Sequence, residues 1–130
     1  FVQFPERAGG QGGLIKYSVS PEGPTGIYFT DLEGNAKCIN SDASHWHVAV
    51  DREGKFVVSD TGSAGVESDI MITNIDTGKT VKIDHVNRWP DHPGHPHPCF
   101  SPEGNRVIYT FKKPDGNLAV AVMDISDLRK

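Results

Sequence analysis

The chain has 130 residues, a length that suits a single domain. Thirteen Lys and Arg against seventeen Asp and Glu give a net charge of −4 without a basic stripe, so no nucleic-acid partner is expected. No apolar run approaches the ~18 residues that a membrane-spanning helix needs, so no membrane partner is expected either.

Short β-branched or alternating runs, separated by turns that contain Gly or Pro, predict strands along most of the chain. In chain order, the predicted strands cover 26–39 (as a hairpin), 45–50, 55–60, 69–75, 80–84, 97–100, 106–111 and 118–124. Helix is predicted at most as a last turn within 124–130. The sequence therefore predicts an all-β fold.

Four antiparallel strands in each unit of ~40–50 residues are typical of a β-propeller blade. The units are a partial blade at 1–40, a blade at 41–91 and a blade at 92–130. Because propellers close with about four to eight blades, we expect the C-terminal part of one larger propeller, completed by its remaining blades or by a companion chain. The structural alternative is a small independent β-sandwich.

The two units share a histidine pattern. Residues 44–54 align with residues 94–104 without a gap, which places His45 on His95 and a second pair, His47 and His97, two residues later. Alternate residues of a strand point to the same face. His45 and His47 should therefore present two imidazoles together, and so should His95 and His97.

Matched starts of inner strands lie next to each other in a propeller, so we expect His45 to approach His95 and His97. The turn Pro93-Gly94 would bring His92 back toward them. Neutral imidazole is a common ligand of transition metals, and this clustering predicts a metal site formed by His45, His92, His95 and His97. The alternative is that these histidines are exposed turn residues or polar residues of the channel.

Four further residues are weaker candidates for contacts with a substrate or with the metal ligands. They are His47, His85, Arg88 and Trp89. An Arg can pair with carboxylates and a Trp face can stack on sugar rings, but hydrogen bonding and packing between blades explain these residues at least as well. Two cysteines, Cys38 and Cys99, are predicted as separate buried thiols, with a disulfide as the alternative.

The second half of the chain resembles the oligogalacturonate lyases, which are seven-bladed propellers of the polysaccharide lyase class. The resemblance covers about residues 45–124, and its most specific segment is His-Pro-His-Pro-x-Phe-Ser-Pro-x-Gly at 95–104, followed by the strand at 107–110. Further similar segments are a His that opens the preceding blade at His45, the segment Asp60-Thr-Gly62, and the His-x-x-x-Trp spacing of His85 and Trp89.

The resemblance implies a metal, usually manganese, held by His45, His95 and His97. A fourth ligand in that family is a Gln, and His92 stands at its position here. This departure leaves zinc or calcium as further possibilities beside manganese. The implied reaction is β-elimination on short uronic-acid-containing oligosaccharides, as in pectin degradation, with the metal as a Lewis acid.

The family's catalytic base belongs to earlier blades, so the resemblance assigns no catalytic residue to this chain. We therefore expect these 130 residues alone to bind metal weakly, to associate through open sheet edges, and to show no lyase activity. The rival functions are a non-catalytic TolB-like propeller module that binds protein or carbohydrate, and a metal-dependent hydrolase or isomerase on the same scaffold. A bacterial cytoplasmic and a periplasmic location are equally compatible with the sequence.

Overall fold

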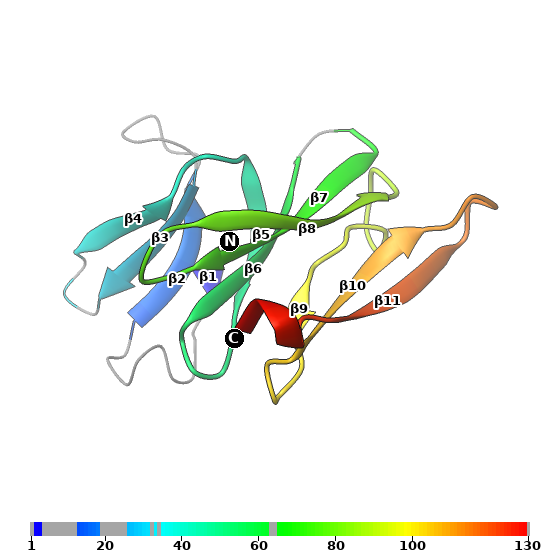
Figure 1. The fold of residues 1–130 in the computed structure, drawn as a ribbon. Helices are drawn as coiled ribbons and strands as arrows, with labels where there is room; N and C mark the ends of the chain where they lie inside the picture. Colours follow the sequence, from blue (N-terminus) through cyan, green and yellow to red (C-terminus); the bar gives the residue numbers. More distant parts are fainter. Residues whose placement is uncertain are drawn as a thin grey trace.

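The computed structural model of the chain describes residues 2–3, 13–18, 26–31, 33, 35–62 and 65–129. In these residues, strands form three antiparallel sheets that lie side by side (Figure 1). The predicted all-β class of propeller type is confirmed. No helix in the described ranges has the length and apolar character that crossing a membrane requires.

Each sheet is called a blade here. Blade 1 contains β1 (Val2–Gln3), β2 (Gly13–Ser18), β3 (Gly26–Asp31) and β4 (Ala36–Asn40). Blade 2 contains β5 (His45–Val50), β6 (Phe56–Thr61), β7 (Glu67–Asn74) and β8 (Thr80–Asn87). Blade 3 contains β9 (Cys99–Phe100), β10 (Arg106–Lys112) and β11 (Leu118–Asp124), and a 3-10 turn, η1 (Ser126–Arg129), follows it.

One blade differs from its predicted strand content. Blade 1, predicted as a partial unit, has four strands, whereas blade 3 has, within the described residues, the three strands that were predicted for it. Blade 2 follows the prediction in all four strands, although β8 continues to Asn87, beyond the predicted end at residue 84. The first strands of blades 2 and 3, β5 and β9, are in contact, as expected for neighbouring blades.

The larger apolar core fills the space between blades 2 and 3. Side chains of the strands of both blades form this core. Its buried members are Ala49, Val58, Ile70, Ile72, Val86, Val107, Tyr109 and Ile125. Burial of apolar surface contributes about 25 cal/mol per Å², so this seam holds the two blades together. A second core joins blade 1 to blade 2 through Ile27, Ile39, Val48 and Val57.

A polar contact reinforces the seam between blades 2 and 3. The hydroxyl of Tyr109 on β10 donates a hydrogen bond to Asp84 Oδ2 on β8 at 2.5 Å. Burial, followed by this hydrogen bond, raises the pKa of Tyr109 well above its ordinary value, so the phenol stays protonated. The contact therefore fixes the relative position of the two blades that carry the histidines.

The cysteine prediction needs one correction. Cys38 and Cys99 are separate free thiols, as predicted, but both are exposed rather than buried. Cys38 lies on the fourth strand of blade 1, where the first three residues of the strand are exposed.

Candidate metal centre

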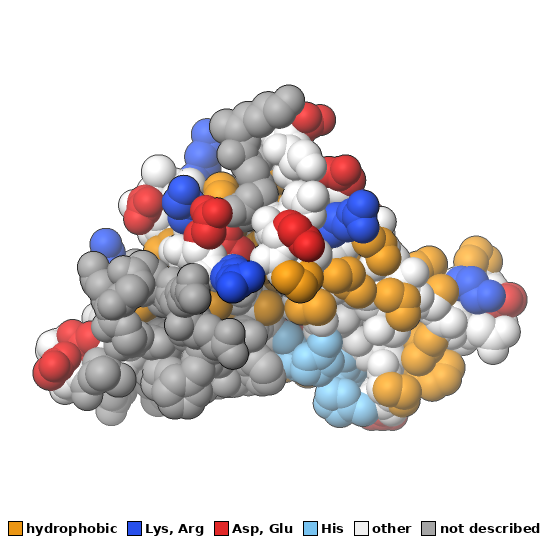
Figure 2. All heavy atoms as spheres, turned by 90° about the horizontal axis from the view of Figure 1, so that it is seen from below, with side chains coloured by type: hydrophobic (Ala, Val, Ile, Leu, Met, Phe, Trp, Pro, Cys, Tyr) orange, Lys and Arg blue, Asp and Glu red, His pale blue; other side chains and the backbone are white. Residues whose placement is uncertain are grey.

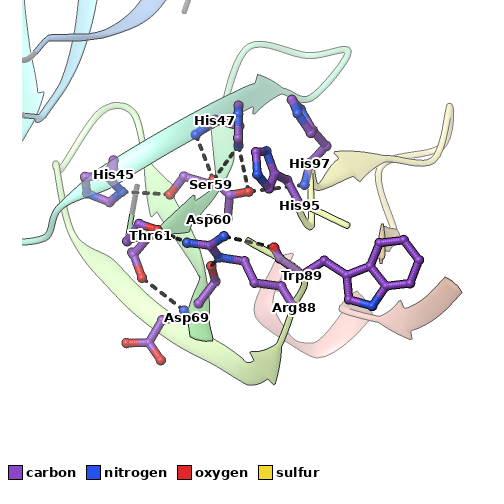
Figure 3. Close-up of polar contacts among 12 residues, drawn as sticks. His45, His47, Ser59, Asp60, Thr61, Asp69, Arg88, Trp89, His95 and His97 are labelled. Atoms are coloured by element: carbon purple, nitrogen blue, oxygen red, sulfur yellow. Dashed lines mark hydrogen bonds and ion pairs between the residues drawn. The ribbon is translucent and has the colours of Figure 1, made fainter. Parts of the chain in front are cut away.

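Three histidines converge between blades 2 and 3. His47 comes from β5, and His95 and His97 come from the segment that precedes β9, residues 90–98, called the histidine loop here. One ring nitrogen from each lies within 4.8 Å of those of the other two. Figure 3 shows these rings close together above Asp60, and Figure 2 shows histidine side chains gathered in one exposed patch.

His47 is held by a buried carboxylate. Its Nδ1–H donates to Asp60, at 2.9 Å from Oδ2 and 3.1 Å from Oδ1, and its backbone N–H donates to Oδ1 at 2.7 Å. Because the proton of the neutral ring is on Nδ1, Nε2 carries the lone pair. A His that donates its other nitrogen to a carboxylate is the usual arrangement of histidine metal ligands.

His95 uses the opposite nitrogen. Its Nε2–H donates to the carbonyl oxygen of Pro90 at 2.8 Å, which leaves the lone pair on Nδ1. The residue is only 7% exposed, and its Nδ1 is buried without a hydrogen-bond partner. Buried polar atoms almost always have a partner, so this nitrogen is the strongest indication that a ligand belongs in the cluster.

His97 is the exposed member of the three. Its ring lies against that of His47, with 3.6 Å between centroids and a tilt of 32° between the planes, and its backbone N–H donates to Asp60 Oδ2 at 3.1 Å. Its φ of 44° is left-handed, a conformation that costs a non-glycine residue roughly 1 kcal/mol or more. Partial burial and then the nearby His47 lower the pKa of His97, which favours the neutral, metal-binding form.

His92 lies beside this cluster rather than within it. Its ring centroid is 4.1 Å from that of His95 and 5.4 Å from that of His97, but the residue is exposed and is not among the three converging nitrogens. Of the four predicted ligands, the structure therefore brings His95 and His97 together with His92 adjacent.

His45, the fourth predicted ligand, is not in the cluster. A β-bulge between His45 and Val48 breaks the expected alternation, so His45 and His47 point to opposite faces of blade 2. His45 Nε2 donates to Asn40 Oδ1 at 2.9 Å, and its Nδ1 accepts from the hydroxyl of Ser59 at 2.7 Å. Both ring nitrogens are thus occupied, Nε2 by a bond that joins blade 2 to blade 1 and Nδ1 by a bond within blade 2, and His47 takes the place predicted for His45.

Burial of His45 predicts acid sensitivity. Desolvation lowers its pKa to about 4, against a partial opposing effect of Asp42. The unfolded chain therefore takes up this proton first, and stability is complete above pH ~6.5 and falls by roughly 3 kcal/mol as the pH approaches 4. Urea unfolding of the wild type and of His45→Gln across this range should show a flatter pH dependence in the variant; equal slopes would contradict the prediction.

Arg88 is buried and makes its hydrogen bonds within the protein, and its role toward a substrate stays a prediction. It is 1% exposed, and its guanidinium donates to Ser68 Oγ at 2.9 Å and to the carbonyl oxygens of Gly62 at 2.6 Å and Trp89 at 3.1 Å. It also lies over the ring of Trp46, 5.2 Å from the centroid. Trp46 in turn contacts both His47 and His95, so Arg88 is linked to the cluster through Trp46.

Trp89 anchors the histidine loop to blade 3. Its indole N–H donates to the carbonyl oxygen of Gly116 at 2.9 Å, in the turn between β10 and β11. The ring is 37% exposed, so one part of it remains accessible. The role of Trp89 toward a substrate or the metal ligands stays a prediction.

Gly94 packs so closely on Trp89 that a side chain cannot be added. A Cβ at this position would lie 2.2 Å from the Cβ of Trp89. We expect Gly94→Ala to displace the histidine loop and to cost about 1–3 kcal/mol, as overpacking does. Thermal unfolding measures the effect, with Asp91→Ala, an exposed change in the same loop, as control; equal stability of the two variants would refute the packing argument.

His85 lies elsewhere. It is exposed on β8, where its Nδ1 contacts Asp69 at 2.6 Å and its Nε2 contacts Glu67 at 3.4 Å. These carboxylates raise the pKa of His85, Asp69 first and then Glu67. The structure gives this histidine partners outside the cluster.

Sequence reasoning gave two residues too little weight. His47 was only a weak candidate because the bulge in β5 has no signature in the sequence. Asp60 entered only as part of a resemblance, although an Asp inside the strand Phe56–Thr61 was a usable signal. Asp is almost never fully buried unless it is paired, and Asp60 is 0% exposed.

The fold has counterparts among solved structures. TolB from Acinetobacter baumannii superposes with a TM-score of 0.69 at 17% identity over 88% of this chain and 27% of its own. The tricorn protease gives 0.65 at 22% identity, over 99% and 12%. A structure from a study of two prolyl endopeptidases gives 0.63 at 17% identity, over 95% and 20%. No protein-family model and no curated protein sequence matched the chain.

At these identities the likeness establishes the fold alone, which is of the TolB-like propeller type. The chain spans between 12% and 27% of the length of these three structures. Those structures include enzymes, so the scaffold is compatible with catalysis without assigning any reaction to this chain.

Proposed function

We propose that the chain provides a divalent-metal site to a propeller enzyme, a metal-dependent lyase that cleaves uronic-acid-containing oligosaccharides by β-elimination. The observation that carries the metal part is the buried Nδ1 of His95, which has no partner and lies in a group with His47 and His97. The lyase part depends on the resemblance of residues 95–104 to the oligogalacturonate lyases.

The residues fit a transition metal. Two nitrogens bound to one zinc ion at about 2.1 Å lie roughly 3.4 Å apart in a tetrahedral site, so the three rings would have to close by roughly 1 Å. Three chain ligands with a further open position are typical of catalytic rather than structural zinc sites. His92 is near enough to the cluster to be a fourth ligand or a hydrogen-bond donor.

The donor set also bears on which metal is held. Imidazole suits zinc, copper, nickel and iron, whereas calcium takes oxygen ligands and manganese prefers them. Manganese, first choice by resemblance, is therefore less favoured by the three nitrogen donors than zinc, and calcium is the least favoured. Competition between Zn²⁺, Mn²⁺ and Ca²⁺ in equilibrium dialysis would rank the three.

In the proposed reaction, a bound metal would neutralise the carboxylate of the uronate and make its α-proton more acidic. The chain's own residues hold the site in place: Asp60 orients His47, the carbonyl of Pro90 orients His95, and Trp46 packs on both. We assign no catalytic base within these residues. The exposed part of Trp89 is the proposed stacking surface for a sugar ring.

Because the catalytic base is expected outside these residues, the test is to incubate the complete propeller that contains them with oligogalacturonate and to follow the ultraviolet absorbance of an unsaturated uronate. Activity that is lost on chelation and restored by one divalent metal supports the proposal. Cleavage without an unsaturated product would indicate a metal-dependent hydrolase instead. Metal binding without cleavage of any acidic oligosaccharide would favour the second candidate, a non-catalytic TolB-like module, for which the likeness to TolB is the supporting observation.

A further inference from the structure

Asp60 is the most deeply buried charged side chain next to the histidines. It is 0% exposed and lies near the end of β6, where neither of its oxygens can reach bulk water. A buried carboxylate is costly unless donors and positive charge surround it. Its place in the molecule therefore calls for an explanation beyond packing.

The carboxylate bridges two blades. Through Oδ1 and Oδ2 it accepts the ring and backbone N–H groups of His47, which belongs to blade 2. Through Oδ2 it also accepts the backbone N–H of His97, which belongs to the loop that leads into blade 3. One buried group thus touches two of the three converging histidines from both sides of the seam, as Figure 3 shows.

Each contact has a separate effect on the cluster. The bond to Nδ1 assigns the ring proton of His47 and leaves the lone pair on Nε2. The bond to the backbone of His97 holds a residue whose φ of 44° is otherwise disfavoured. Without these contacts, His47 could change tautomer and His97 could return to a common backbone conformation.

We propose that Asp60 is the positioning residue of the metal site. It sets the nitrogen that His47 presents and the backbone conformation that aims His97, so that ligands from two blades meet at one point. This inference rests on the proposed function, because it assumes that the cluster holds a metal. It concerns only how the chain positions the ligands, and the contacts that do so are present without a metal.

The test compares Asp60→Asn with Asp51→Asn in the full chain. Asp51 is a matched control: it is 2% exposed, belongs to the same blade, and accepts the backbone N–H groups of Lys55 and Phe56. An amide at position 60 replaces one acceptor oxygen with an NH₂ donor that faces existing donors. We expect zinc affinity, measured against a competing chelator, to fall about 10–100-fold in Asp60→Asn and to be unchanged in Asp51→Asn.

A second measurement needs neither metal nor a folded variant. Long-range ¹H–¹⁵N spectra of the metal-free wild type should show the ring proton of His47 on Nδ1. A proton on Nε2, or zinc binding as tight in Asp60→Asn as in the wild type, would overturn the inference. Failure of the wild type to bind zinc would instead overturn the proposed function. The tautomer of His47 would then still show whether Asp60 sets the nitrogen that His47 presents.

Discussion

Replacing His95 with alanine should reduce zinc affinity by more than about 100-fold. Loss of a residue that only orients a ligand typically costs 10–100-fold, so loss of a ligand itself should cost at least as much. His95 is chosen because its buried Nδ1 has no partner in the protein. Isothermal titration of the purified protein with Zn²⁺ measures the change.

The control for this experiment is His85→Ala. His85, on β8 of blade 2, is likewise a histidine, but it is exposed and interacts with Asp69 and Glu67, outside the cluster. Its removal should leave zinc affinity within a factor of about two, the usual scatter of such context-dependent effects. Equal losses in the two variants would mean that the histidines bind zinc at the surface without a defined site.

The largest expected effect on stability is at the seam between blades 2 and 3. Ile70 is fully buried in that core, and truncation to alanine should lower the free energy of unfolding by about 2–5 kcal/mol, since it removes apolar contacts and leaves a cavity. Urea unfolding followed by circular dichroism measures it. Ile70 belongs to β7, which is not part of the histidine cluster.

Val120→Ala is the matched control for this second prediction. Val120 lies on β11 and is 65% exposed, so its truncation should change the free energy of unfolding by no more than about 0.5 kcal/mol. A loss at Val120 as large as that at Ile70 would show that the outer face of blade 3 is packed in solution against another surface.

The sequence was sufficient for the strands and their grouping, because alternation and turn residues are local signals. Strands such as Arg106–Lys112 and Leu118–Asp124 were predicted to within a residue. The pairing of the two histidine segments was also predictable, since a gap-free repeat places equivalent strands side by side. Two of the converging residues, His95 and His97, followed from that repeat, whereas His92, which borders the cluster, was predicted from the turn at Pro93-Gly94.

The error at His45 has a structural origin. A regular strand would have placed His45 and His47 on one face, but the bulge in β5 turns His45 toward Ser59 and Asn40. Whether a strand contains a bulge depends on how it pairs with its partner, which a single sequence does not encode locally. The role of Asp60 was hidden for a related reason, because its partners come from two blades.

The separation of the converging histidines along the chain affects when the cluster can form. His47 lies on β5 of blade 2, whereas His95 and His97 lie in the histidine loop that leads into blade 3, so no single blade contains the three nitrogens. Contacts between distant segments form late in folding, because the entropy of closing the intervening chain has to be overcome first. An ion held there would therefore slow unfolding rather than speed folding, because it stabilises contacts that are absent from the transition state of folding.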